Sequence, residues 1–319
     1  MSRFKGLRRT AFLFVLNLAI GDTLLILTNV PVLVVSSFKT QWVAGVSGCR
    51  LFAFCGGLSG FVSINTLTIL AVERAVVIAH HLPNTNRLSQ RGVLILCCCI
   101  WIYSFLWSIP PYLGWGGHMM EGSQTSCTFD YFTRTVNNTT YVISILVFCF
   151  GLQLVIITIS YVRILIEVFF HRKDVARSFN KRQDAAFCLR VASNKNRNIE
   201  WRTTKAVLSL VTVYCLSWMP YAIISVIGQF GNQSLITPLS SALPGVFAKM
   251  SSFVNPIIYT LLHSKYRQMI WPCCVKRKRK LTTSGKRSEL EKISNSSTDC
   301  KNSKTLLPVE NIPAKSTTV

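Results

Sequence analysis

The sequence predicts an all-α membrane protein. Of its 319 residues, 50% are hydrophobic and only 15% are charged, and the apolar residues come in long blocks. A helix needs about 20 mainly apolar residues to cross the hydrocarbon core of a bilayer. Six blocks are long enough, and we expect each to be a transmembrane helix: residues 10–38, 48–79, 92–115, 140–170, 203–230 and 237–262.

The first block is too long and too polar for a cleavable signal sequence. It contains Asn17 and Asp22, and no small-residue cleavage site follows it. The apolar region of a signal peptide is about 7–15 residues long and ends before such a site. We therefore count this block as a transmembrane span.

The positive charges predict which connections face the cytoplasm. The net charge is +23, and Lys and Arg gather in residues 3–9, 87–91 and 172–205 and in the tail at 276–280. Cytoplasmic connections carry an excess of Lys and Arg, so these segments are expected inside, where anionic lipid attracts them. This placement favours a membrane partner and disfavours nucleic acid.

The remaining connections are then expected outside the cell, and their chemistry agrees. Asn137, Asn138 and Asn232 each begin an Asn-X-Ser/Thr sequence, the acceptor for N-glycosylation. Cys49 and Cys127 fall on the same side, where oxidation to a disulfide is allowed.

Ionisable residues inside the spans point to function. A charged side chain at a helix centre costs about 2.5–3.5 kcal/mol on insertion scales, so each one needs a reason. Lys249 lies near the middle of the last span, too far from either end to reach water. It can pair with a carboxylate, or burial can leave a neutral amine that forms a Schiff base with an aldehyde. Position alone leaves both open.

A series of motifs resembles the rhodopsin-like G-protein-coupled receptors over residues 7–267. In order, they are Asn17-Leu18-Ala19 with Asp22, Cys49, Glu73-Arg74-Ala75, Trp115, Ser217-Trp218-Met219-Pro220-Tyr221 and Asn255-Pro256-Ile257-Ile258-Tyr259. Each motif alone is weak, but together at helical spacing they are specific. The resemblance implies a rhodopsin-like seven-helix bundle of which six transmembrane helices are present. Residues 7–9 resemble the loop after the family's first helix, so we expect that helix to be missing.

Within this family, a lysine six residues before the Asn-Pro pair marks the opsins, and Lys249 and Asn255 have this spacing. The resemblance implies a light-sensing receptor of the plasma membrane or photoreceptor membrane, with retinal (11-cis or all-trans) bound to Lys249 as a Schiff base. Trp218 and Tyr221 resemble the aromatic residues around the retinal ring, although Tyr221 is equally explained as core packing. Residues 263–267 favour a non-vertebrate-visual type.

Glu121 resembles the loop glutamate that serves many opsins as the counterion of the Schiff base. Vertebrate visual opsins instead use a glutamate three residues after the cysteine of the third helix, where this chain has Phe52. A solvated surface glutamate and a bound anion are the alternatives. The resemblance also implies a disulfide between Cys49 and Cys127 that fastens the outer loop over the pocket.

The residues at the cytoplasmic ends of the expected spans resemble those that transmit the signal in this family. Glu73 and Arg74 resemble its arginine lock, and Glu200 is placed to pair with Arg74, unless it is an exposed charge. Light would isomerise retinal and open this lock to a heterotrimeric G protein. Further expected parts of the activation switch are Asp22, Asn255, Pro256 and Tyr259. The family also has a proline in the fifth helix, which the segment 151–154 lacks.

Residues 1–272 are expected to form the transmembrane domain, ending in a short amphipathic cytoplasmic helix, and residues 273–319 a disordered cytoplasmic tail. Cys273 and Cys274 are candidates for palmitoylation. The Ser/Thr clusters of the tail suit a receptor kinase and arrestin, and Thr317-Thr318-Val319 resembles a ligand for PDZ domains.

Two other functions remain open at this stage. The first is a ligand-activated receptor of the same class without retinal, in which Lys249 is structural. The second is a retinal photoisomerase. The signalling motifs and the long Ser/Thr tail favour a receptor over an enzyme.

Overall fold

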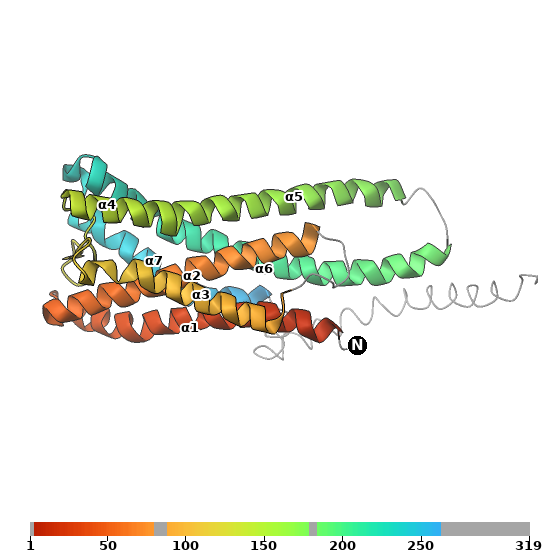
Figure 1. Ribbon diagram of the computed structural model, residues 1–319, viewed down its shortest axis with the longest axis horizontal. Coiled ribbons are helices and arrows are strands. Elements are labelled where there is room, and N and C mark those ends of the chain that lie inside the picture. The colour runs from red at the N-terminus through yellow and green to blue at the C-terminus, as the bar shows by residue number, and fades with distance from the viewer. Residues whose placement is uncertain (1–2, 80–87, 179–183, 263–319) are drawn as a thin grey trace, which may run out of the picture. The chain divides into compact units, whose positions relative to one another are not determined.

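The computed structural model describes residues 3–79, 88–178 and 184–262. They form long helices that run side by side in alternating directions (Figure 1). The helices are α1 (Arg3–Phe38), α2 (Gly45–Ala79), α3 (Gln90–Ser108), α4 (Val136–Ser144), α5 (Leu152–Ser178), α6 (Asp184–Phe230) and α7 (Pro238–Leu262). Single 3₁₀ turns, η1 (Pro110–Tyr112) and η3 (Gln233–Leu235), lie in the connections, and η2 (Ile145–Gly151) is a π-helical segment that joins α4 to α5.

To within one residue, five of the six expected spans lie on a helix or, for residues 140–170, on the continuous α4–η2–α5 rod. The third, residues 92–115, is too long, because α3 ends at Ser108 and a 3₁₀ turn and a loop follow. Five segments of the described chain are long and apolar enough to cross a membrane: Phe12–Phe38, Gly45–Ile78, Gln90–Tyr112, Val136–Glu167 and Thr204–Phe230. The sixth expected span is α7, which is helical but is not among these five segments. The expected limits of the fourth and fifth spans are too short. Both helices continue through polar sequence to Ser178 and from Asp184, because a helix does not have to end where its apolar residues end.

Helix α2 is the centre of the bundle. It contacts α1, α3, α5, α6 and both strands. In its most apolar window, 61% of the residues are buried inside the protein, against 22–28% in the other four segments. The other helices therefore turn much of their apolar surface outwards, as expected for helices in contact with lipid.

The helix that runs from α4 to α5 is distorted without a proline. Residues 145–151 form a π-helical segment, a distortion often found at functional sites. Just after it, the side-chain amide of Gln153 donates to the Asn65 side-chain oxygen on α2 at 2.9 Å and to the Phe148 carbonyl at 3.3 Å. The missing proline therefore does not mean a regular helix here.

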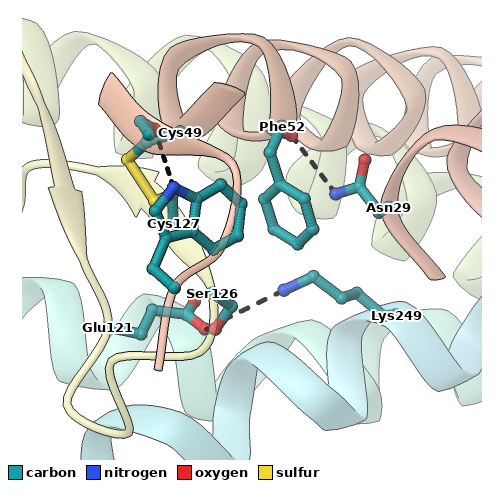
Figure 2. Close-up of a disulfide and its surroundings, with 9 residues drawn as sticks. Asn29, Cys49, Phe52, Glu121, Ser126, Cys127 and Lys249 are labelled. Atoms are coloured by element: carbon teal, nitrogen blue, oxygen red, sulfur yellow. Dashed lines mark hydrogen bonds and ion pairs between the residues drawn. A yellow bond between two sulfur atoms is a disulfide. The ribbon is translucent and has the colours of Figure 1, made fainter. Parts of the chain in front are cut away.

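A short hairpin covers the outer end of the bundle. Strands β1 (His118–Met120) and β2 (Cys127–Phe129) pair antiparallel, with Met120 opposite Cys127. The backbone N–H of Glu121 donates to the Ser126 carbonyl at 2.8 Å and narrows the loop between the strands. A disulfide joins Cys127 to Cys49 at the start of α2, with the two Cα atoms 5.3 Å apart (Figure 2). The loop is therefore fixed against the central helix.

Candidate functional site

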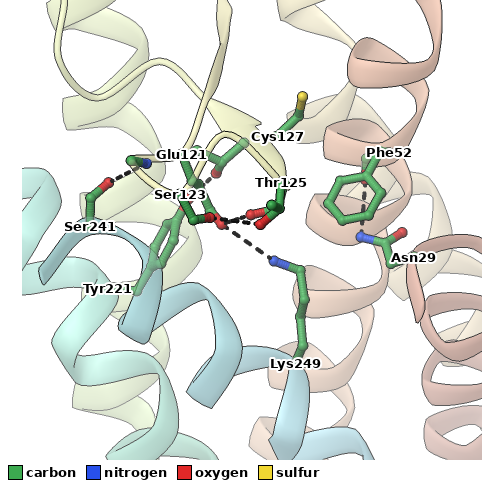
Figure 3. A network of polar contacts seen from close by, with 12 residues as sticks. Asn29, Phe52, Glu121, Ser123, Thr125, Cys127, Tyr221, Ser241 and Lys249 are labelled. Carbon is green, nitrogen blue, oxygen red and sulfur yellow. Dashed lines mark hydrogen bonds and ion pairs between the residues drawn. The ribbon is translucent and has the colours of Figure 1, made fainter. Parts of the chain in front are cut away.

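The amine of Lys249 points from α7 towards the hairpin loop (Figure 3). Its Nζ lies 3.9 Å from a carboxylate oxygen of Glu121 and 5.4 Å from the centre of the Phe52 ring. The side chain of Lys249 is 15% exposed and that of Glu121 only 2%. Glu121 is therefore not a solvated surface residue, and that alternative is wrong.

The Glu121 carboxylate is only partly satisfied by neutral donors. The hydroxyl of Ser126 donates to Oε2, the oxygen that also faces Lys249. The other oxygen, Oε1, is buried and has no hydrogen-bond partner among the described residues. A buried carboxylate is costly unless it is paired with a cation.

A mainly apolar cavity lies beside this pair. Its walls come from α1, α2, the hairpin, α6 and α7: Leu25, Asn29, Phe52, Ala53, Gly56, Gly57, Phe61, Glu121, Cys127, Thr128, Phe129, Trp218, Tyr221, Gly245, Ala248 and Lys249. A second cavity, lined in part by Ile145 and Cys149 of η2, shares Phe61, Phe129, Trp218 and Tyr221 with the first. Their mainly apolar linings, which meet at these four residues, suit an apolar ligand with one end at the amine.

Aromatic side chains form the wall that the two cavities share. Trp218 stacks on Tyr214 with ring centres 5.4 Å apart, and Tyr221 meets Trp218 edge-on at 6.2 Å. The hydroxyl of Tyr221 shares a hydrogen bond with Thr128 of the hairpin. Tyr221 is thus both a wall of the cavity and a link between α6 and the outer loop.

Of the residues expected in the activation switch, the structure shows Asp22 and Asn255 in contact. The amide of Asn255 on α7 donates to Asp22 on α1 at 2.9 Å, and the hydroxyl of Ser63 on α2 donates to the other carboxylate oxygen at 3.4 Å. Asp22 therefore links three helices. Pro256 lies inside α7, one residue beyond Asn255.

At the inner end of α2, Arg74 is 2% exposed and lies 2.6 Å from Glu73. The side chains of Glu200 and Tyr259 fall outside those that the structure describes, so the expected pair between Glu200 and Arg74 stays a prediction. The same applies to Cys273 and Cys274, to the short cytoplasmic helix and to the tail.

The three candidate glycosylation sites differ in exposure. Asn137 and Asn232 are exposed. Asn138 is only 4% exposed, and its side-chain amide donates to the carbonyls of Asp130 at 2.6 Å and Thr133 at 2.8 Å. A glycan on that nitrogen would have no room and would break these bonds. We therefore correct the expectation for Asn138, which holds the loop together instead.

Sequence reasoning missed the residues that hold Glu121 in place. Ser126 donates a hydrogen bond to the carboxylate, but nothing in the sequence distinguishes it from the other polar residues of the loop. Gly245 lines the cavity one helical turn before Lys249 on α7. The four-residue spacing of Gly245 and Lys249 was a usable signal, because it places both on one face of a helix.

Comparisons with known proteins agree with this geometry. A family described as "7 transmembrane receptor (rhodopsin family)" matches residues 1–259. A Gq-coupled rhodopsin of Mizuhopecten yessoensis is 41% identical over 289 residues, covering 88% of this chain and 57% of the relative. Melanopsin-A of Danio rerio is 37% identical over 271 residues, covering 84% and 45%. The chain thus spans about half the length of these relatives.

Among solved structures, squid rhodopsin matches with a TM-score of 0.74 and 31% identity, covering 83% of this chain and 75% of that one. The expected likeness to rhodopsin-like receptors and the expected fold class are therefore confirmed. A receptor family, rather than an enzyme family, accounts for the chain.

Proposed function

The chain belongs to the rhodopsin family of seven-transmembrane receptors, and we propose that it is a light-sensing, G-protein-coupled receptor that carries retinal on Lys249. The observation that carries this proposal is the Lys249 amine beside the buried Glu121 carboxylate, 3.9 Å away at the end of an apolar cavity. Its setting is a plasma membrane or photoreceptor membrane.

The residues around the cavity fit retinal. Retinal is a long apolar aldehyde, and the two adjoining cavities offer apolar walls with a single amine. The partly satisfied Glu121 supplies the negative charge that a protonated imine at Lys249 needs. No other Asp or Glu lines either cavity, among the residues that the structure describes.

Each part of the site then has a role. Retinal supplies the absorption of visible light and a change of shape. Lys249 holds it covalently, Glu121 balances the charge at the nitrogen, and the disulfide at Cys127 keeps the loop closed over them. Trp218 lines both cavities on α6. A push on Trp218 would shift α6 between two arrangements and expose a groove for a heterotrimeric G protein.

The remaining roles belong to the same proposal. Arg74, with Glu73 and Glu200, would form the cytoplasmic lock, and Asp22, Asn255, Pro256 and Tyr259 would link it to the cavity. A receptor kinase and arrestin would act on the tail, a PDZ domain on Thr317–Val319, and palmitate on Cys273 and Cys274. Asn137 and Asn232 would carry glycans.

Absorption spectra of the full-length protein test the attachment. After incubation with 11-cis-retinal or all-trans-retinal in separate samples, the wild type should gain a visible band that Lys249→Ala lacks. The double variant Lys249→Ala/Glu121→Gln should also lack it, which rules out an unpaired carboxylate as the cause. Lys39→Ala, which removes an exposed lysine at the end of α1, should keep the band. A visible band that survives in Lys249→Ala contradicts the proposal.

Light-dependent nucleotide exchange on a G protein separates a receptor from the alternatives. A colourless protein activated by a diffusible ligand would be an ordinary receptor. A pigment that releases isomerised retinal with each photon and activates no G protein would be a photoisomerase.

A further inference from the structure

Three residues on one face of α7 meet the hairpin loop. Ser241, Gly245 and Lys249 are four residues apart, so they follow one another along the helix at intervals of about 6 Å. At the outer end of this row, the Ser241 hydroxyl accepts a hydrogen bond from the Gly122 backbone N–H at 3.2 Å. At the inner end, the Lys249 amine faces Glu121. Gly245 lies between these two contacts.

The carboxylate of Glu121 rests directly on Gly245. A Cβ atom at position 245 would lie 2.6 Å from Oε1 and 2.8 Å from Oε2 of Glu121, closer than Cβ atoms approach other atoms in proteins. The backbone at Gly245 does not have a positive φ angle, so the requirement for glycine is one of space. Any other residue would force the carboxylate to move.

We propose that Gly245 is a positioning residue that sets the distance between the Glu121 carboxylate and the nitrogen of Lys249. The inference rests on the proposed function, in which that nitrogen carries a positive charge. In this role Gly245 acts by letting the carboxylate approach α7. A larger residue there lifts the carboxylate off the helix and weakens its pairing with the charge.

A side chain at position 245 should change the position of the Glu121 carboxylate without preventing the protein from folding. The atoms that a new Cβ would meet are the end of a flexible side chain, which can turn aside. Gly122 shows the opposite case, because a Cβ there would meet the backbone of Pro238 at 2.6 Å. We therefore expect Gly245→Ala to fold and to bind retinal, whereas Gly122→Ala displaces the loop itself.

A pH titration of the visible band in the full-length pigment measures the pairing. The protonated imine absorbs visible light and the neutral imine absorbs near the ultraviolet, so the midpoint pH reports the proton affinity. For Gly245→Ala we expect the midpoint to fall by about one pH unit, a roughly tenfold loss of proton affinity. Gly92→Ala, whose added methyl lies 3.5 Å from its nearest neighbour at the start of α3, should leave the midpoint unchanged.

A double-mutant cycle shows whether Gly245 acts through Glu121. In a Glu121→Gln background, Gly245→Ala should have little further effect on the midpoint, because the charge that it displaces is gone. The proposal is overturned if Gly245→Ala lowers the midpoint equally in the wild-type and Glu121→Gln backgrounds, or if it does not lower the midpoint in the wild-type background. Thermal unfolding of the retinal-free variants is the folding control. If Gly245→Ala proves unstable, the double variant Gly245→Ala/Glu121→Asp should restore stability, because the shorter aspartate side chain leaves room for the added methyl group.

This design separates the two proposals. If the wild type forms no pigment, the proposed function fails. If the wild type forms a pigment whose midpoint is insensitive to Gly245→Ala, only the role of Gly245 fails.

Discussion

The bundle holds two buried carboxylates, Glu121 and Asp22, in different ways. Glu121 is 2% exposed and Asp22 is 4% exposed. Glu121 lies on a loop between two three-residue strands, and Asp22 lies within helix α1. Glu121 has one oxygen bound by Ser126 and one without a partner, whereas both oxygens of Asp22 accept hydrogen bonds from neutral side chains.

The difference shows what each group can do. Asp22 is satisfied by an amide and a hydroxyl, so it serves to join α1, α2 and α7. Glu121 keeps unused capacity to accept hydrogen bonds, and a lysine amine lies 3.9 Å away. A loop-borne carboxylate also depends on distant contacts for its position, because its own segment is too short to fold alone. We expect the two sites to respond to different mutations.

Loss of the disulfide should have the largest effect, and only on the Glu121 site. Cys49→Ser/Cys127→Ser removes a link between residues 78 apart, and we expect a loss of about 2–4 kcal/mol in the free energy of unfolding. The loop should detach from α2, and retinal binding should be lost with it. Thermal unfolding and the yield of visible pigment measure these effects.

Hydrogen exchange shows whether the Glu121 loop loses stability independently of the helices around Asp22. In the Cys49→Ser/Cys127→Ser variant, exchange should accelerate in residues 117–131 and stay slow around Asp22 in α1. Equal acceleration in both regions would mean that the bundle unfolds as one unit, and the contrast between the two carboxylates would not hold. Cys98→Ser, which changes an exposed free cysteine of α3, is the matched control.

Replacing Asp22 should have a smaller effect that depends on hydrogen bonding rather than on charge. Asp22→Asn can still accept from Asn255 and donate to Ser63, so we expect a change of less than about 1 kcal/mol in the free energy of unfolding. Asp22→Leu leaves the Asn255 amide buried without its acceptor and should cost about 1–3 kcal/mol. Thermal unfolding of the two variants decides the matter, and equal losses would show that the charge of Asp22 is what matters.

Much of the helical fold was predictable because transmembrane helices follow the apolar content of the sequence. Five of the six expected spans lie on helices to within one residue. The third was placed too long, because apolar residues continue beyond Ser108 although α3 ends there, just before Pro110 and Pro111. The extensions of α5 and α6 were missed, because no apolar pattern marks helix outside the membrane. The π-helical distortion before Gln153 was also missed, since a helix distortion without proline leaves no plain mark in the sequence.

The site was predictable in its chemistry but not in its geometry. The depth of Lys249 in its span and its spacing from Asn255 singled out the amine, and the resemblance singled out Glu121. The burial of Glu121 was implied only by the resemblance, because a polar loop by itself usually faces water. Its position depends on a hairpin of two three-residue strands, and on Gly245, a residue with no side chain whose importance lies in the space that it leaves.

The pH dependence of the hairpin gives the smallest expected effect. His118 on β1 is partly buried against Tyr112, with ring centres 5.5 Å apart. Burial, and then the positive charge of Arg50, lower the pKa of His118 below its usual value of 6.5. The folded state therefore favours neutral histidine, so the contribution of His118 to stability is complete above about pH 6.5 and declines as the pH falls from there to the folded-state pKa. The unfolding temperature of the wild type should fall over this window.

His118→Phe keeps an aromatic ring against Tyr112 but cannot bind a proton, so its unfolding temperature should fall less over the same window. Arg50→Gln should narrow the window by removing one cause of the shift. If wild type and His118→Phe lose stability in parallel, another group titrates there. Because His118 lies on the hairpin, this loss should also destabilise the Glu121 loop before the helices that hold Asp22, and hydrogen exchange at about pH 5.5 tests that order.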